Sequence, residues 1–144
     1  MAGGKASTFE NDWLKLIFNA VAIANIADNA AASPLTNLYV SLHTADPGNS
    51  GDQTTTEAAY TSYARVAVPR TSGGWTVSGN SVSPATIITF PTATAGAEVE
   101  TFFGVGTAIS GTGKLLYRGP VTASIAVSVG VIPQLTTSTA ITEA

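Results

Sequence analysis

The side chain best suited to acid–base chemistry is His43, the single histidine of the chain. It follows Ser41 by two residues and precedes Asp46 by three. A histidine that is oriented by a carboxylate and faces a hydroxyl is typical of nucleophilic hydrolases. This spacing matches no catalytic motif, however, and the chain contains no cysteine. We therefore interpret His43 as bonded to loop backbone or exposed at an interface, and the sequence predicts no enzyme.

Oxygen-bearing side chains gather in one glycine-containing loop after His43. They are Asp46, Asn49, Asp52 and Glu57. Carboxylate and amide oxygens are the ligands that calcium prefers, but the spacing does not match an EF-hand loop. We therefore favour a solvated acidic loop over a calcium site.

Two other patterns resemble sites without completing them. Glu98 and Glu100 are two residues apart, so in a strand both carboxylates face the same way, which is part of what a glycosidase requires. Solvent-facing charge is the alternative that we favour. A glycine run ends in Gly113 and Lys114, but Leu115 stands where a phosphate-binding loop needs serine or threonine. The sequence therefore predicts no catalytic residue, no cofactor and no metal ligand.

The composition excludes several classes of protein. The 144 residues are 10% charged, against about 25% in ordinary soluble domains, and the net charge is −3. Because the six cationic residues are scattered along the chain, a basic groove for nucleic acid is not expected. The longest apolar stretch is interrupted by Asn25 and Asp28, so we expect no membrane span. A surface with so little charge suits permanent contact with neighbouring subunits.

An amphipathic helix is predicted over residues 8 to 28. Its apolar side chains recur at helical spacing, at Phe9, Trp13, Leu16, Ile17, Ala20, Val21 and Ala24. Ser7 and Glu10 have the spacing of a capping box at its start. Ser33 precedes Pro34, and a residue before proline is pushed out of the helical conformation, so the helix must end before this point.

Short alternating or β-branched segments follow the helix. They are Leu38–His43, Tyr63–Val68, Trp75–Val77, Ile87–Phe90, Val99–Val105, Lys114–Arg118, Ile125–Val131 and Thr139–Thr142. Glycine and proline separate them, and no helical pattern recurs between them, so an antiparallel β-sandwich or barrel is expected. We predict one mainly β domain, with an N-terminal arm and helix over 1–34 and the β-sandwich over 35–144.

Several motifs from Leu38 onward resemble a family of small virion proteins of tailed bacteriophages. The run LYVSLHTADPG starts at Leu38, and it is followed by YTSYARV from Tyr60, GWTV from Gly74, FGVGT from Phe103 and GKLLY from Gly113. Members of this family are often labelled tail fibre proteins, and some resemble head decoration (cement) proteins. The resemblance to decoration proteins implies a β-sandwich of jelly-roll type.

Two functions are expected from this resemblance. The first is a decoration protein that binds the major capsid protein on the outer surface of the head as a homodimer or homotrimer and stabilises the shell. The alternative is a tail fibre or tail-tip module that binds a receptor through the loop 46–56.

The predicted helix either packs on its own sandwich or lies in a groove of the capsid protein or of a neighbouring copy. The candidate interface residues are Phe9, Trp13, Leu16 and Ile17 on the helix, together with Trp75. For the aromatic residues among them, a place in the core is the simpler interpretation. For Trp75 the interface alternative rests on its position directly after Gly73 and Gly74.

Overall fold

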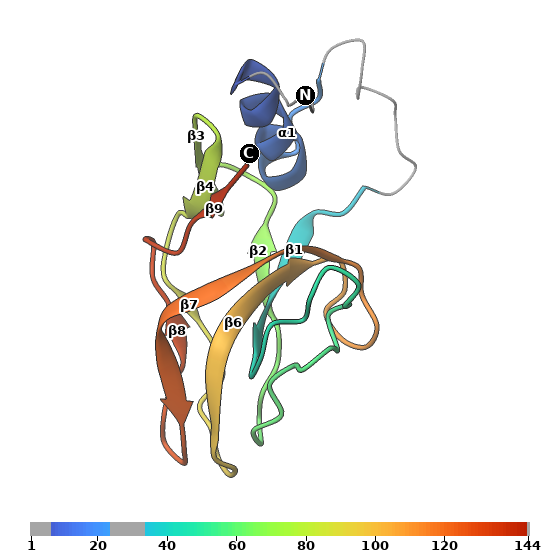
Figure 1. Cartoon of the computed structure of the whole chain (residues 1–144). Helices are drawn as coiled ribbons and strands as arrows, with labels where there is room; N and C mark the ends of the chain where they lie inside the picture. Colours follow the sequence, from blue (N-terminus) through green and yellow to red (C-terminus); the bar gives the residue numbers. More distant parts are fainter. Residues whose placement is uncertain (1–6, 24–33, 144) are drawn as a thin grey trace, which may run out of the picture.

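A computed structural model of the chain describes residues 7–23 and 34–143, without the side chains of Ser7 and Phe9 (Figure 1). This part of the chain contains one helix, α1 (Ser7–Asn19), and nine strands. The strands are β1 (Asn37–His43), β2 (Val66–Pro69), β3 (Trp75–Ser78), β4 (Ser81–Pro84), β5 (Ile88–Thr89), β6 (Glu98–Gly106), β7 (Leu115–Val127), β8 (Gln134–Leu135) and β9 (Ile141–Thr142).

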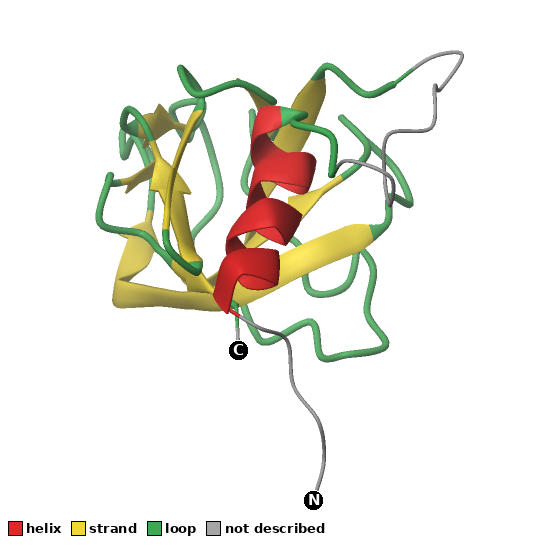
Figure 2. Cartoon of the chain, turned by 90° about the horizontal axis from the view of Figure 1, so that it is seen from above, coloured by secondary structure: helices red, strands yellow, loops and turns green. Residues whose placement is uncertain are grey.

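The strands form three sheets in which all pairs of neighbours are antiparallel. A four-stranded sheet has the order β2-β1-β6-β7, a three-stranded sheet the order β3-β4-β9, and β5 pairs with β8. The helix lies across one end of this β body (Figure 2). The prediction of a mainly β, antiparallel fold with one N-terminal helix is therefore confirmed.

Most predicted strands are present, but their boundaries differ in instructive ways. The segments predicted at 114–118 and 125–131 overlap one continuous strand, β7, because both of its halves pair with β6, and the predicted strand residues 128–131 lie beyond its end. The strands β4 and β8 were not predicted. Both are short, and β4 consists of Ser-Val-Ser-Pro, in which only one residue is β-branched.

The helix ends at Asn19, so the prediction that it continues to residue 28 is wrong for residues 20–23. Ala20 has a left-handed backbone with φ of 53°, and the N–H of Val21 donates back to the carbonyl of Lys15 at 3.1 Å. A left-handed residue directly after the last turn is a common way to end a helix. The predicted helical residues 24–28 lie outside the described part of the chain.

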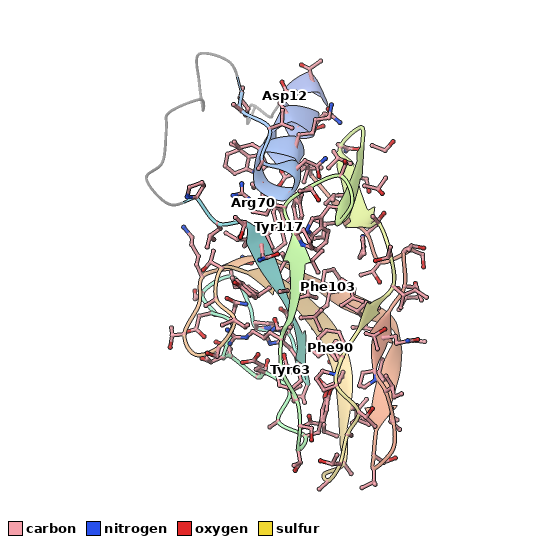
Figure 3. All side chains as sticks on the ribbon, turned by 180° about the vertical axis from the view of Figure 1, so that it is seen from behind. Asp12, Tyr63, Arg70, Phe90, Phe103 and Tyr117 are labelled. Carbon is pink, nitrogen blue, oxygen red and sulfur yellow. The ribbon has the colours of Figure 1, made fainter. Side chains whose placement is uncertain are left out.

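The face that α1 buries is rotated by one position from the predicted face. Leu14 and Phe18 are fully buried and join the same hydrophobic cluster as the strands, whereas Trp13 is 38% exposed. The rings of Phe18 and Trp75 pack edge to face with their centroids 4.7 Å apart. Trp75 is only 2% exposed, so its place is in the core, which also contains Phe90 and Phe103 (Figure 3).

Both ends of the described chain are attached to the hairpin formed by β3 and β4. Near the N-terminal end, the side-chain amide of Asn11 donates to the carbonyl of Gly79 at the turn. Near the other end, β9 pairs with β4, and the N–H of Glu143 donates to the carbonyl of Asn80 at 2.8 Å. The helix and the last strand therefore lie at the same end of the β body (Figure 1).

A buried polar network and an exposed apolar surface

The two side chains that suggested catalysis, Ser41 and His43, are fully buried. Both faces of β1 are covered: Leu38, Val40 and Leu42 point into the core, and the loop 44–65 covers the opposite face. The sequence predicted a strand with one exposed face. It could not show that a loop of such polar composition folds back over that face.

His43 is held as a neutral imidazole. Its Nδ1 lies 2.8 Å from the carbonyl oxygen of Thr55, which can only accept, so Nδ1 carries the proton. Nε2 lies 2.8 Å from the Ser41 hydroxyl, which therefore donates to it. Burial lowers the pKa of His43 more than the bond to Thr55 raises it. The expectation that His43 bonds to loop backbone is therefore confirmed.

A buried ion pair fixes the same loop to the turn after β6. The Arg65 guanidinium contacts both carboxylate oxygens of Glu57, at 2.6 and 2.8 Å, and donates to the carbonyls of Ala108 and Gly111. The hydroxyl of Tyr63 donates to Glu57 at 2.9 Å. Because each nitrogen of the Arg65 guanidinium and both oxygens of the Glu57 carboxylate have a partner, the network rigidifies the loop.

Glycines leave the space that this network occupies. A Cβ at Gly104 would lie 2.7 Å from both Nε2 of His43 and Oγ of Ser41. The side chain of Gln53, which is fully buried, occupies the space beside Gly106 and Gly113 and accepts from the N–H of Ala108. Gly104, Gly106 and Gly113 therefore leave the space that these polar side chains need, whereas Gly111 has open space around it and is instead required by its positive φ of 69°.

The loop oxygens that suggested calcium are used in other ways. Asp46 and Asn49 both accept hydrogen bonds from Arg118, and Asp52 accepts from the N–H and hydroxyl of Thr54, which lowers the pKa of Asp52. Within residues 7–23 and 34–143, no three acidic or histidine side chains gather as metal ligands would.

The Glu98 and Glu100 pair does not face solvent, contrary to the interpretation that we favoured. Glu98 accepts hydrogen bonds from the N–H groups of Ala59 and Tyr60, both at 2.8 Å. Glu100 is fully buried, and neither of its carboxylate oxygens has a hydrogen-bond donor within the described structure. Burial first, and then the neighbouring Glu98 carboxylate, raise the pKa of Glu100 to about 8.

Exposed and partly buried apolar side chains gather where α1 meets the start of β1 and β7. We call this the α1 surface, and it comprises Trp13, Leu16, Ile17, Leu35 and Leu116. Two adjoining hollows, of about 650 and 400 Å³, share Ile17 and Leu116 in their walls. Three of the predicted interface residues, Trp13, Leu16 and Ile17, thus lie together, whereas the side chain of Phe9 lies outside the described part.

Arg70 fixes the helix beside this surface. Its guanidinium donates to the carbonyls of Leu16, Ile17 and Leu35, at 2.6 to 2.7 Å. A cation that binds the last carbonyls of a helix also interacts favourably with the helix dipole. Sequence reasoning missed Arg70, because its partners are backbone groups up to 54 residues away.

No helix within the described residues is both long and apolar enough to cross a membrane.

No curated protein matches the chain. A family described as "Podophage GP4 fiber I protein gp80" matches residues 5–142, which is nearly the whole chain and includes both the polar network and the α1 surface. The protein therefore belongs to this family of podophage fibre proteins, and so to the virion proteins of tailed bacteriophages.

Proposed function

We propose that the protein is a structural subunit of a phage tail fibre. The observation that carries this proposal is the match to a fibre protein family over residues 5–142. A covered sheet, a buried ion pair and a hydrogen-bonded loop suit a part that must keep its shape while it is attached to other proteins. The role is non-enzymatic, since Ser41 and His43 are both enclosed, with Ser41 bonded to His43 and His43 bonded to the loop.

The α1 surface is the part of the molecule best suited to assembly into a homodimer or homotrimer. Leu35 is 41% exposed and Trp13 is 38% exposed, and both border hollows that another subunit can fill. Leu35→Asp places a charge on this surface and is expected to shift the protein toward monomer in analytical ultracentrifugation. Ile109→Asp is the matched control, because Ile109 is 62% exposed and lies outside the α1 surface. Equal oligomerisation by the wild type and Leu35→Asp would contradict the assignment.

Decoration of the outer head surface, with the major capsid protein as partner, is the second candidate. It is favoured by the low charge of the chain, 10% of residues, and by the absence of a long shaft from the described residues. As a fibre or tail-tip protein, the chain would instead present the loop 46–56 to a host receptor. That loop is held rigidly by Arg118, and Asn49 and Ser50 are exposed on it.

Cryo-electron microscopy of the virion distinguishes the two candidates. Density for this fold on appendages of the tail, in a few copies, supports the fibre role. Regular density on the symmetry axes of the head, in hundreds of copies, supports decoration and contradicts the fibre role. Binding of the purified protein to host cells separately tests receptor recognition, which decoration does not require.

A further inference from the structure

Glu98 joins the start of β6 to the loop that covers the sheet. Its Oε1 atom accepts from the N–H groups of Ala59 and Tyr60, both at 2.8 Å. Tyr60 is buried, and its hydroxyl donates to the carbonyl of Pro91 at 2.9 Å. β6 begins at the end of the β body that lies away from α1 (Figure 1). A single carboxylate therefore fixes two main-chain groups of the loop at that end.

Glu100 lies beside Glu98 without a cation to compensate it. The two residues alternate on β6, so their side chains share one face of the strand. Glu100 is fully enclosed, and no donor of the described residues reaches its oxygens. Glu98 and Tyr60 are the described ionisable groups that interact with it electrostatically, and both are acidic. On β7 it faces Ile125, which has no polar side-chain atom. An ionised Glu100 is therefore a buried, uncompensated charge.

One arrangement satisfies both carboxyl groups. When Glu100 carries a proton, its hydroxyl donates to the Glu98 carboxylate. Glu98 stays ionised and accepts from Glu100 as well as from the N–H groups of Ala59 and Tyr60. Two carboxyl groups in contact cannot both ionise without repulsion, so the pair retains one proton. The pKa of Glu100, raised first by burial to about 8, agrees with a proton held there at neutral pH.

We propose that Glu98 and Glu100 form a pH-dependent contact that holds Ala59 and Tyr60 while the pair keeps its proton and releases them when the proton is lost. Glu98 is the side chain that moves, because it is only partly buried whereas Glu100 is enclosed. When Glu98 turns toward solvent, the two N–H groups lose their acceptor. This response to pH goes beyond the proposed structural role, which does not require it.

The release is confined to these two N–H groups, because the residues on either side have other acceptors. The N–H of Ala58 donates to the carbonyl of Leu42 at 2.8 Å, and the N–H of Thr61 donates to the carbonyl of Ala95 at 2.9 Å. Neither acceptor is ionisable, so both bonds persist when Glu100 ionises. The exposed residues 94–97 beside the loop are uncharged. Outward movement of Glu98 therefore adds a negative charge to a neutral part of the surface.

NMR spectroscopy of the ¹⁵N,¹³C-labelled wild-type protein tests the proposal, with spectra recorded from about pH 6 to about pH 10. The side-chain carboxyl ¹³C signal of Glu100 should titrate with a midpoint of about pH 8. Above this midpoint we expect the amide signals of Ala59 and Tyr60 to disappear, because freed N–H groups exchange rapidly with water at alkaline pH. The amide signals of Ala58 and Thr61 should remain and serve as the internal control. This test does not depend on any variant folding.

Glu100→Gln replaces the acid with an amide, which donates to Glu98 at every pH. In this variant the amide signals of Ala59 and Tyr60 should persist over the whole range. Asp12→Asn is the matched control, because it removes an exposed carboxylate on α1 and should leave the titration as in the wild type.

Persistence of the Ala59 and Tyr60 signals in the wild type, or their equal loss in Glu100→Gln, would overturn the proposal. Simultaneous loss of the Ala58 and Thr61 signals would overturn it in favour of general unfolding of the loop. A midpoint lowered by millimolar calcium chloride, but not by sodium chloride of equal ionic strength, would overturn it in favour of a cation between the two carboxylates. The assay uses free protein, so its failure leaves the proposed function unaffected.

Discussion

Replacing Glu100 with glutamine should change how the stability of the protein depends on pH. Glu100 is fully buried on β6, and its carboxylate oxygens have no hydrogen-bond donor in the described structure. Its pKa is raised from 4.5 to about 8, first by burial and then by Glu98. Between these two pH values the folded protein holds a proton that the unfolded chain releases, so the free energy of unfolding falls as the pH rises.

The size of the effect follows from the shift in pKa. Each unit corresponds to about 1.4 kcal/mol, so the change from 4.5 to about 8 sets a ceiling of about 5 kcal/mol. Reorientation of Glu98 and entry of water around the ionised group reduce the expected loss to about 2–4 kcal/mol. Glutamine has a similar shape and never ionises. Glu100→Gln should therefore be within about 1 kcal/mol of the wild type near pH 5 and more stable by about 2–4 kcal/mol near pH 9.

Urea denaturation followed by tryptophan fluorescence, repeated from about pH 5 to pH 9, measures this difference, and Trp75 in the core supplies the signal. Glu98→Gln serves as the comparison. It changes the hydrogen bond between the two side chains and removes the neighbouring negative charge, but it leaves burial, the largest cause, in place, so most of the pH dependence should remain. Parallel stability curves for the wild type and Glu100→Gln over the whole range would refute the reasoning.

Three further substitutions test the contacts that fix the loop and the helix. Gly104→Ala should lower the free energy of unfolding by about 1–3 kcal/mol, because the added Cβ meets His43. The control Gly73→Ala, whose Cβ would have only one atom within 4 Å, should leave the stability nearly unchanged. Equal losses of stability in the two variants would contradict this reasoning. Arg65→Met leaves the Glu57 carboxylate without its cation and should lower the free energy of unfolding, measured by urea denaturation, by about 3–5 kcal/mol. An unchanged urea midpoint would show that the ion pair is not needed for stability. Arg70→Lys replaces three separate donor nitrogens with one ammonium nitrogen, which cannot occupy the positions of Nε, Nη1 and Nη2 together, and should cost about 1–3 kcal/mol. Protection of the α1 amides from hydrogen exchange should then fall, and unaltered exchange would argue against the role of Arg70 in fixing the helix.

The strands could be predicted where their own residues alternate in hydrophobicity or are β-branched or aromatic. Alternation from Leu38 to His43 and the β-branched and aromatic residues of β6 mark two central strands correctly. The continuity of β7 could not be predicted, because Gly119 and Pro120 are typical of a turn, and only pairing with Phe102 and Phe103 of β6 keeps the chain extended there.

The site depends on long-range contacts that leave little trace in a single sequence. The helical period of α1 is clear, but Trp13 and Leu14 are both apolar, and only docking on the β3–β4 hairpin decides that Leu14 is buried. Glu100 could have been suspected to be buried, because it lies on the same strand as the apolar and glycine-rich run Phe102–Gly106. The role of Arg70 could not have been predicted, because its three acceptors are main-chain carbonyls, which every residue possesses.

The attachment of both ends of the described chain to the β3–β4 hairpin has a mechanical consequence. Tension between the two ends is carried by Asn11, by the short β4–β9 pairing and by the bond from Glu143 to Asn80. The four-stranded sheet joins this path at its β7 edge, where the Tyr117 hydroxyl accepts from Trp13 at 2.8 Å and donates to Glu143 at 2.7 Å, whereas the long β6–β7 pairing lies outside it. Stretching the molecule by its ends is therefore expected to peel β9 away at low force while the loop 44–65 and the sheet beneath it remain intact.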